Sequence, residues 1–179
     1  MSNRRPAFLF LVASLFFTTF ETVSATEGYY RWPSAHGDTM VFNAEGDLWR
    51  LTEGQSQATR LTTHGELESD AAIAPDGERV AFVASFDGIA QIYVMPLAGG
   101  ITKQITVESV GVEISQWSPD GGILYTSRNM EGASRARELR LVNPGSLEVE
   151  RVPLRYASTD TFSDDGDTLF FTRHGVSTV

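Results

Sequence analysis

The sequence predicts an all-β fold made of a repeated four-stranded unit, and a turn repeat with a regular spacing supports this prediction. Four turn sequences are each followed by a short apolar run: Ala35-His36-Gly37-Asp38, Ala74-Pro75-Asp76-Gly77, Ser118-Pro119-Asp120-Gly121 and Ser163-Asp164-Asp165-Gly166. Their glycines are spaced by about 40, 44 and 45 residues. A period of about 40–45 residues with four strands per unit is typical of a β-propeller blade.

The second unit shows the pattern most clearly. Pro75 presets φ in its turn, and Gly77 supplies the left-handed conformation that closes a tight hairpin. The run 79–84 is almost continuously apolar, which predicts a strand buried on both faces. Two further strands are expected over residues 91–95 and 102–106, separated by glycine-containing turns.

We expect blades at residues 29–62, 71–106, 112–153 and 157–179, and the last of these is incomplete. Propellers close with about 4–8 blades, because each sheet packs against its neighbours around a ring. About three and a half blades cannot close such a ring. The prediction is therefore a partial β-propeller that is incomplete without further C-terminal blades, at the front of a longer protein.

Residues 1–25 are predicted to be a secretory signal peptide rather than part of the fold. Arg4 and Arg5 precede the uncharged apolar block 7–20, and Val23-Ser24-Ala25 offers small residues at the cleavage position. A membrane anchor is the alternative, but the block is shorter than the ~20 apolar residues of a spanning helix. We expect an exported chain, periplasmic or secreted and soluble once the peptide is removed. Without cysteine it has neither a lipoprotein attachment site nor disulfides.

The charge balance excludes two partner classes. The chain has 23 acidic residues against 14 lysines and arginines, which gives a net charge of −9 with Lys103 as the single lysine. Nucleic acids and anionic membrane surfaces are bound through basic patches, so neither is an expected partner.

Several segments resemble the tricorn-type β-propeller at the N-terminus of bacterial tricorn-like serine peptidases. They are Gly28–Pro33, His36–Phe42, Gly46–Trp49, Arg60–His64, Ile92–Gly100 and the Pro-Asp-Gly turns. The likeness covers essentially the whole chain after residue 25, although the turns are shared with TolB-type propellers and with relatives of prolyl oligopeptidase.

The resemblance implies a propeller that admits or filters peptide substrates. In this family the catalytic part, with its serine nucleophile, lies far downstream, usually beside a PDZ-like module. The implied partners are a peptide or protein substrate and the downstream protease and PDZ-like domains of the same full-length chain, with homo-oligomerisation left open. No catalytic residue can be carried over to any position here.

The sequence itself also contains no recognisable catalytic motif. The sequence has no serine-nucleophile elbow, zinc-protease motif, phosphate-binding loop or dinucleotide fingerprint. His36, His64 and His174 lie on or near turns without partners at a defined spacing. Acidic residues at 164, 165 and 167 could suggest calcium, but they fall at the turn of the repeat, so a turn role is preferred. We therefore expect no cofactor, no metal and no catalytic residue in this chain.

Arginines in the third unit are the candidate substrate-binding residues. Arg135, Arg137 and Arg140 could hold a peptide carboxylate through bidentate contacts. The alternative is a solvated loop and outer strand. The three tryptophans, Trp32, Trp49 and Trp117, are expected to pack between sheets rather than to stack on a ligand.

Two function classes remain open. The first is the substrate-handling propeller of an exported tricorn-like serine peptidase. The second is a TolB-type periplasmic protein-binding propeller without enzymatic activity. A TolB-type chain normally carries a small α/β domain before the propeller, whereas the first blade is expected soon after Thr26 here, which favours the first class.

The signal-peptide prediction is tested by processing. In an exporting host we expect the mature chain to start at Thr26, because the small residues end at Ala25. Mass analysis of the N-terminal peptide checks this. Retention of residues before Ala25 in the mature protein would favour the membrane anchor instead.

Overall fold

The computed structural model describes residues 29–128, 137–155, 157–163 and 165–173. The predicted signal peptide, Arg135 and His174 lie outside these residues. All regular structure in the described residues is β-strand, and this confirms the predicted all-β class. The described residues include no helix long and apolar enough to cross a membrane.

The described strands form three sheets of four strands and one of two. The first sheet contains β1 (Arg31–His36), β2 (Thr39–Ala44), β3 (Asp47–Thr52) and β4 (Thr59–Arg60). The second contains β5 (Glu68–Ile73), β6 (Arg79–Ala84), β7 (Gln91–Pro96) and β8 (Lys103–Gln104). The third contains β9 (Val112–Trp117), β10 (Ile123–Arg128), β11 (Arg137–Val142) and β12 (Val149–Arg155). The last contains β13 (Ala157–Phe162) and β14 (Leu169–Arg173).

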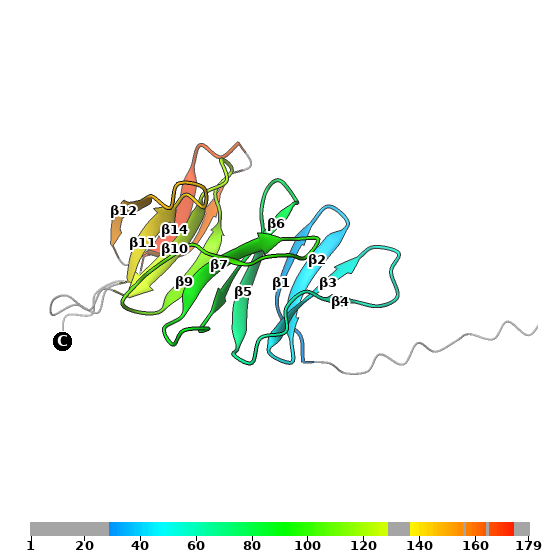
Figure 1. The fold of residues 1–179 in the computed structure, drawn as a ribbon. Helices are drawn as coiled ribbons and strands as arrows, with labels where there is room; N and C mark the ends of the chain where they lie inside the picture. The colour runs from blue at the N-terminus through cyan, green and yellow to red at the C-terminus, as the bar shows by residue number, and fades with distance from the viewer. Residues whose placement is uncertain (1–28, 129–136, 156, 164, 174–179) are drawn as a thin grey trace, which may run out of the picture.

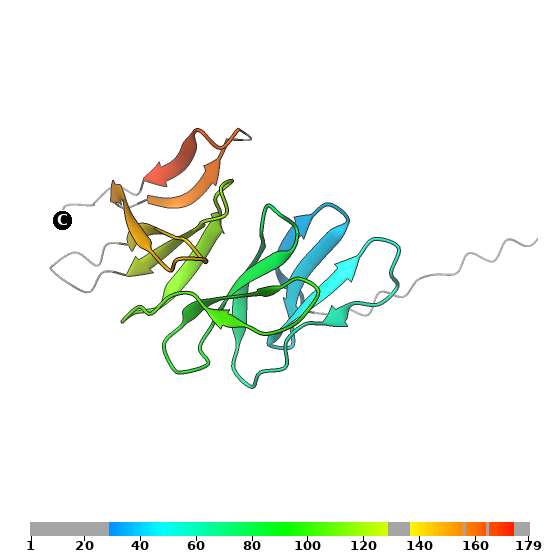
Figure 2. The same ribbon diagram turned by 45° about the horizontal axis from the view of Figure 1, so that its top comes forward.

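The sheets lie side by side in chain order and form an open arc (Figures 1 and 2). Within each sheet, strands adjacent in sequence pair antiparallel. The first strands of consecutive sheets, β1, β5, β9 and β13, contact one another along the arc. This is the arrangement of blades around a propeller axis, so the predicted partial, unclosed propeller is confirmed.

The repeated turns adopt the geometry that their residues predict. The amide of Gly77 donates to the Ala74 carbonyl at 2.9 Å, and Gly121 and Gly166 make the equivalent bonds at 2.9 and 2.8 Å. Gly77 has φ +69°, a left-handed conformation that glycine adopts without steric cost. The side chain of Asp165 accepts hydrogen bonds from Ser163 Oγ at 2.5 Å and from the Asp167 amide at 3.1 Å, so it serves its own turn.

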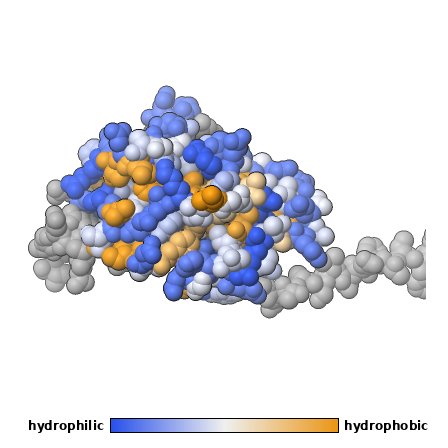
Figure 3. Space-filling view, in the orientation of Figure 1, coloured by the Kyte–Doolittle hydropathy of each residue, from blue (hydrophilic) through white to orange (hydrophobic). Residues whose placement is uncertain are grey.

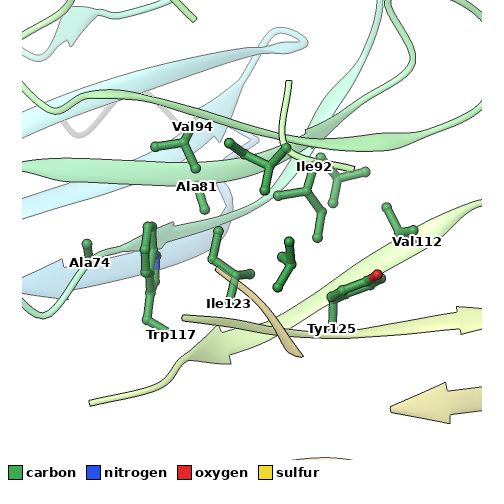
Figure 4. Close-up of a cluster of buried hydrophobic side chains, with 11 residues drawn as sticks. Ala74, Ala81, Ile92, Val94, Val112, Trp117, Ile123 and Tyr125 are labelled. Carbon is green, nitrogen blue, oxygen red and sulfur yellow. The ribbon is translucent and has the colours of Figure 1, made fainter. Parts of the chain in front are cut away.

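The second sheet is apolar on both faces, and each face packs against a different neighbour. Ala81 and Val83 of β6 join the cluster shared with the third sheet, while Val80 and Phe82 join the cluster shared with the first. Figure 4 shows the first of these clusters, where Ile92 of β7 and Ile123 of β10 meet between the sheets. Since side chains alternate across a strand, a continuous apolar run supplies both faces at once.

Repeated threonines join the short fourth strands to their sheets. Leu61 N donates to Leu48 O at 2.8 Å, and Leu48 N donates back to Thr62 Oγ1 at 2.9 Å. Thr106 in the second sheet receives the matching bond from Ile92 N at 2.9 Å. The threonine side chain therefore continues the pairing beyond strands that are only two residues long.

A buried glutamate fixes the start of β5 against the first sheet. The carboxylate of Glu68 accepts from Thr62 Oγ1 and from Leu48 N, and its main-chain carbonyl accepts from Asn43 Nδ2 at 2.8 Å. These bonds explain why β5 begins at Glu68 and not near Ala71, where the apolar pattern begins. Burial raises the pKa of Glu68 to about 7, and the nearby Asp47 carboxylate adds to the rise.

Hydropathy is unevenly distributed over the surface. Figure 3 shows hydrophobic side chains gathered over the part of the arc that Figure 1 places at the third sheet, while most of the remaining view is hydrophilic. Leu147 and Val149, next to or within β12, are 44% and 48% exposed.

The shared core predicts unequal costs for two phenylalanine truncations. Phe82 is fully buried between the first two sheets, so Phe82→Ala should lower the free energy of unfolding by about 3–5 kcal/mol. Phe170 of β14 is 59% exposed, and Phe170→Ala should change it by no more than about 0.5 kcal/mol. Urea unfolding of both variants measures the difference, and equal losses would contradict this description of the core.

Glu68 predicts a pH dependence of stability. Because its folded-state pKa lies above that of a free glutamate, the folded state holds this proton more tightly, and stability falls as pH rises from about 4.5 to about 7. Glu68→Gln removes this loss, which is on the order of 3 kcal/mol. The variant should therefore gain stability over the parent at about pH 8 and much less at about pH 5.

The matched control for this experiment is Glu66→Gln, since Glu66 is an exposed carboxylate in the same segment. It should show no such pH-dependent gain. If Glu68→Gln changed the free energy of unfolding equally at about pH 5 and about pH 8, Glu68 would be ruled out as the titrating group.

Candidate functional site

A cleft of about 1420 Å³ opens where the innermost strands begin. The first residues of β1, β5 and β9 line it, together with the end of β2 and the β2–β3 turn. We call it the inner-strand cleft and define it by Trp32, Asn43, Glu45, Glu68, Asp70 and Glu113. Innermost strands surround the central channel of a closed propeller, so the cleft lies on the side of the arc that would face such a channel.

A β-bulge or irregularity interrupts the pairing of each innermost strand. In β1, Arg31 pairs with Asn43 and Ser34 with Val41, which leaves one extra residue on the β1 side. The pairing of β5 with β6 shifts in the same way, and the β9 and β13 pairings each also contain an irregularity. Bulges of this kind re-aim side chains next to binding sites.

Strained backbone is concentrated in the cleft. Trp32 and Asp70 occupy equivalent places in the β1 and β5 bulges and have φ values of 46° and 51°. Glu45, in the β2–β3 turn, has φ 56°. Positive φ costs a non-glycine residue free energy, so it persists where the surrounding structure holds the residue in place, frequently at functional sites. Among the described residues the fourth such non-glycine position is Leu147, outside the cleft.

Two carboxylates from neighbouring sheets face the cleft. Asp70 comes from β5 and Glu113 from β9. Burial raises the pKa of Asp70, and the negative charge of Glu113 raises it further. Glu113 forms an ion pair with Arg137, whereas the hydrogen bond recorded for the Asp70 side chain comes from Ser69 Oγ at 3.4 Å.

The cleft also contains buried acceptors without partners. Asn43 and Glu68 are 3% and 2% exposed, and both line the cleft. Asn43 Oδ1 and Glu68 Oε1 accept no hydrogen bond from any described residue. Buried polar atoms are normally paired, so these two oxygens mark unused capacity to accept hydrogen bonds.

Aromatic rings form one wall of the cleft. Tyr29, Tyr30 and Trp32 are 75%, 61% and 42% exposed. The guanidinium carbon of Arg31 lies 4.2 Å from the Tyr29 ring centre and 5.5 Å from that of Trp32. This wall therefore already accommodates a cation over aromatic faces. Trp49 also lines the cleft and donates from Nε1 to the Ala44 carbonyl at 3.0 Å.

The predicted arginines separate into different environments. Arg140 Nη1 contacts both carboxylate oxygens of Glu108 at 2.7 and 2.8 Å, and Tyr125 donates to the same glutamate at 2.7 Å. Arg140 thus joins the third sheet to the segment that follows β8. Arg137 pairs with Glu113 and so lies at the edge of the cleft. Arg135 lies outside the described residues.

Other candidates serve the fold. Trp117 is 7% exposed and donates from Nε1 to the Ala72 carbonyl at 2.8 Å, so it packs between sheets as expected. His64 lies 4.1 Å from the Phe86 ring centre, next to the second sheet. In the described part of the chain, no three histidine, aspartate or glutamate side chains are grouped to hold a metal ion.

The acidic and aromatic cleft was not predicted from the sequence. Trp32, Asp70 and Glu113 precede the turn glycines of their units by 5, 7 and 8 residues, so aligning the units on those glycines would have brought them near one another but not to the same position. The bulges and the positive φ values carry no sequence signal of their own, because none of these positions is a glycine.

Comparisons with known proteins agree on the family. The model of the tricorn protease N-terminal β-propeller domain matches residues 27–178. Tricorn protease homolog 1 of Streptomyces coelicolor is 32% identical over 107 residues, which cover 59% of this chain and 10% of that protein. A putative tricorn-like protease N-terminal subunit of Sulfurisphaera tokodaii is 25% identical over 154 residues, or 83% of this chain and 78% of that protein.

A solved structure supports the fold. The putative TolB of Agrobacterium tumefaciens superposes with a TM-score of 0.69 at 22% identity, over 80% of this chain and 53% of that chain. The matched region spans about a tenth of the length of two Streptomyces relatives. The family match covers nearly all of the chain, so the chain belongs to the tricorn protease N-terminal β-propeller family.

Proposed function

We propose that this chain is the N-terminal propeller region of an exported tricorn-like serine peptidase. In this proposal the propeller admits and filters peptide substrates for a catalytic domain elsewhere in the full-length protein. The match to the tricorn N-terminal propeller over residues 27–178 is the observation that carries the proposal. Export rests on the signal-peptide pattern of residues 1–25.

The dimensions and lining of the inner-strand cleft suit a peptide. Its volume of about 1420 Å³ exceeds the ~300–1,000 Å³ of small-molecule pockets. Exposed aromatic rings offer apolar contact, and Asn43 and Glu68 offer hydrogen-bond acceptors. An extended peptide segment can enter such a cleft, whereas a folded domain is too wide, and this difference would provide the filter.

Further parts of the proposal concern partners. Protease and PDZ-like domains of the same full-length protein would receive the admitted peptide. Arg137, at the edge of the cleft, is the predicted arginine that could exchange Glu113 for a peptide carboxylate. Homo-oligomerisation stays a prediction.

The alternative is a TolB-type periplasmic protein-binding propeller with no enzymatic activity. The fold similarity to a TolB structure favours it, and so does a 25% identical TolB of Helicobacter hepaticus. The two proposals differ in what the cleft receives, which is an unfolded peptide in the first and a folded partner protein in the second.

Binding and cleavage assays on the full chain test the proposal. We expect fluorescently labelled, unstructured peptides to bind, as measured by anisotropy, and to remain intact by mass analysis. Cleavage is not expected because no nucleophile with a matching base can be assigned in the sequence. A serine-directed inhibitor is the control for a contaminating protease.

Three outcomes would contradict the proposal. Inhibitor-sensitive turnover by this chain would place the chemistry in the propeller region itself. Failure to bind any unstructured peptide would argue against peptide admission. Binding of folded periplasmic protein in preference to peptides would favour the TolB-type alternative.

A further inference from the structure

The charges that line the inner-strand cleft are mostly negative. Four carboxylate residues line it, namely Glu45, Glu68, Asp70 and Glu113, and Arg31 is the one basic side chain among its lining residues in the described chain. The guanidinium of Arg31 is held at the aromatic wall, where its Nη2 donates to the Tyr29 hydroxyl at 2.6 Å. It forms no ion pair with any of the four carboxylates.

Asp70 is the carboxylate most in need of a cation. It is partly buried beside Glu113, and among the described residues it has no ion-pair partner. A cation placed between Asp70 and Glu113 would relieve the repulsion between these two negative charges. Its charge-assisted hydrogen bonds would also be stronger than those between neutral groups.

A second, independent observation points to a hydrogen-bond donor in the same place. Glu68 Oε1 and Asn43 Oδ1 are unpartnered, and both residues are more than nine-tenths buried. A donor group reaching the floor of the cleft would satisfy acceptors that the described chain leaves open. Ammonium and guanidinium groups are donors only, so they match Asn43 Oδ1, and they match Glu68 Oε1 when Glu68 is ionised.

The aromatic wall supplies the third element of such a site. Arg31 lies over Tyr29 and Trp32, which shows that these rings have a face available to a guanidinium. Trp32 occupies the bulge of β1 that is equivalent to the Asp70 bulge of β5, and these strands are neighbours (Figure 1). A cation beside Asp70 would thus have Trp32 of β1 on one side and Glu113 of β9 on the other.

We propose that the inner-strand cleft binds the positively charged group of a basic peptide, with its ammonium or guanidinium held between Asp70 and Glu113 and against Trp32. The inference rests on the proposed peptide-admitting function and names its substrate class. The charged group can belong to a lysine or arginine side chain or to a free peptide N-terminus, since the chemistry is shared.

The test compares short unstructured peptides of equal length that differ in one property. One carries lysines, one carries glutamines at the same positions and one carries glutamates, all with acetylated N-termini and amidated C-termini. A fourth has the glutamine sequence with a free N-terminus. We expect the lysine peptide to bind at least about tenfold more tightly than the glutamine peptide, and the glutamate peptide to bind most weakly.

Asp70→Asn is the variant that tests the site. Asparagine tolerates left-handed φ and keeps the size of the side chain, so the change removes the charge without disturbing the bulge. It should reduce lysine-peptide binding about tenfold and leave glutamine-peptide binding unchanged. Glu113→Gln should act in the same direction and serves as a second variant if Asp70→Asn folds poorly.

Asp38→Asn is the matched control. Asp38 is exposed in the β1–β2 turn, at the opposite end of β1 from the cleft, and the substitution changes the net charge by the same amount. It should leave all peptide affinities unchanged. Tighter binding of the fourth peptide than of its acetylated form would identify the N-terminus as a source of the bound cation, and a lysine preference identifies the side chain.

Two results would overturn the inference. Equal affinities for the lysine, glutamine and glutamate peptides would remove charge selection while leaving peptide admission intact. Equal losses in Asp70→Asn and Asp38→Asn would assign the preference to overall charge and not to the cleft. Failure of every peptide to bind is a different result, because it contradicts the proposed function itself.

Discussion

Packing of the second sheet between two neighbours is the constraint on which the rest of this structure depends. The strands β6 and β7 are buried along almost their whole length, and alternate side chains enter two separate clusters. A single sheet could not bury two apolar faces by itself, so the second sheet requires a neighbouring sheet on either side. At the far end of the arc, Phe170 of β14 is 59% exposed, as expected for a blade with a neighbour on one side.

Polar contacts at the junctions between sheets set their spacing. Glu68 joins the start of β5 to Leu48 and Thr62 of the first unit. At the next junction, Glu108 accepts from Tyr125 and Arg140 of the third sheet. In both cases a carboxylate at the junction of two units, Glu68 at the start of β5 and Glu108 between β8 and β9, bonds to residues of the neighbouring unit. Apolar packing supplies most of the free energy, and these bonds help to determine register.

The fold could be predicted because it follows from residue patterns within a few positions. The cleft could not, because it depends on contacts between residues far apart in the sequence. Turn residues such as Gly77 and the apolar run of β6 act within a few positions, so their effects can be inferred from the sequence. The pairing of Arg140 with Glu108 joins residues 32 positions apart, and the sequence alone could not distinguish this arginine from Arg137, which lies at the edge of the cleft. The bulges that carry Trp32 and Asp70 depend on strand register.

The position of the cleft follows from the edge character of the innermost strands. In each four-stranded sheet the first strand pairs on one side only, so a bulge near its start disturbs one ladder instead of two. The residues exposed there are also free of the packing demands that fix Phe82 or Ile92. Strain at Trp32 and Asp70, and the unpaired charge of Asp70, can therefore accumulate with little loss of core stability. By this argument, substitutions at those positions can change the proposed ligand preference while the blades keep their packing.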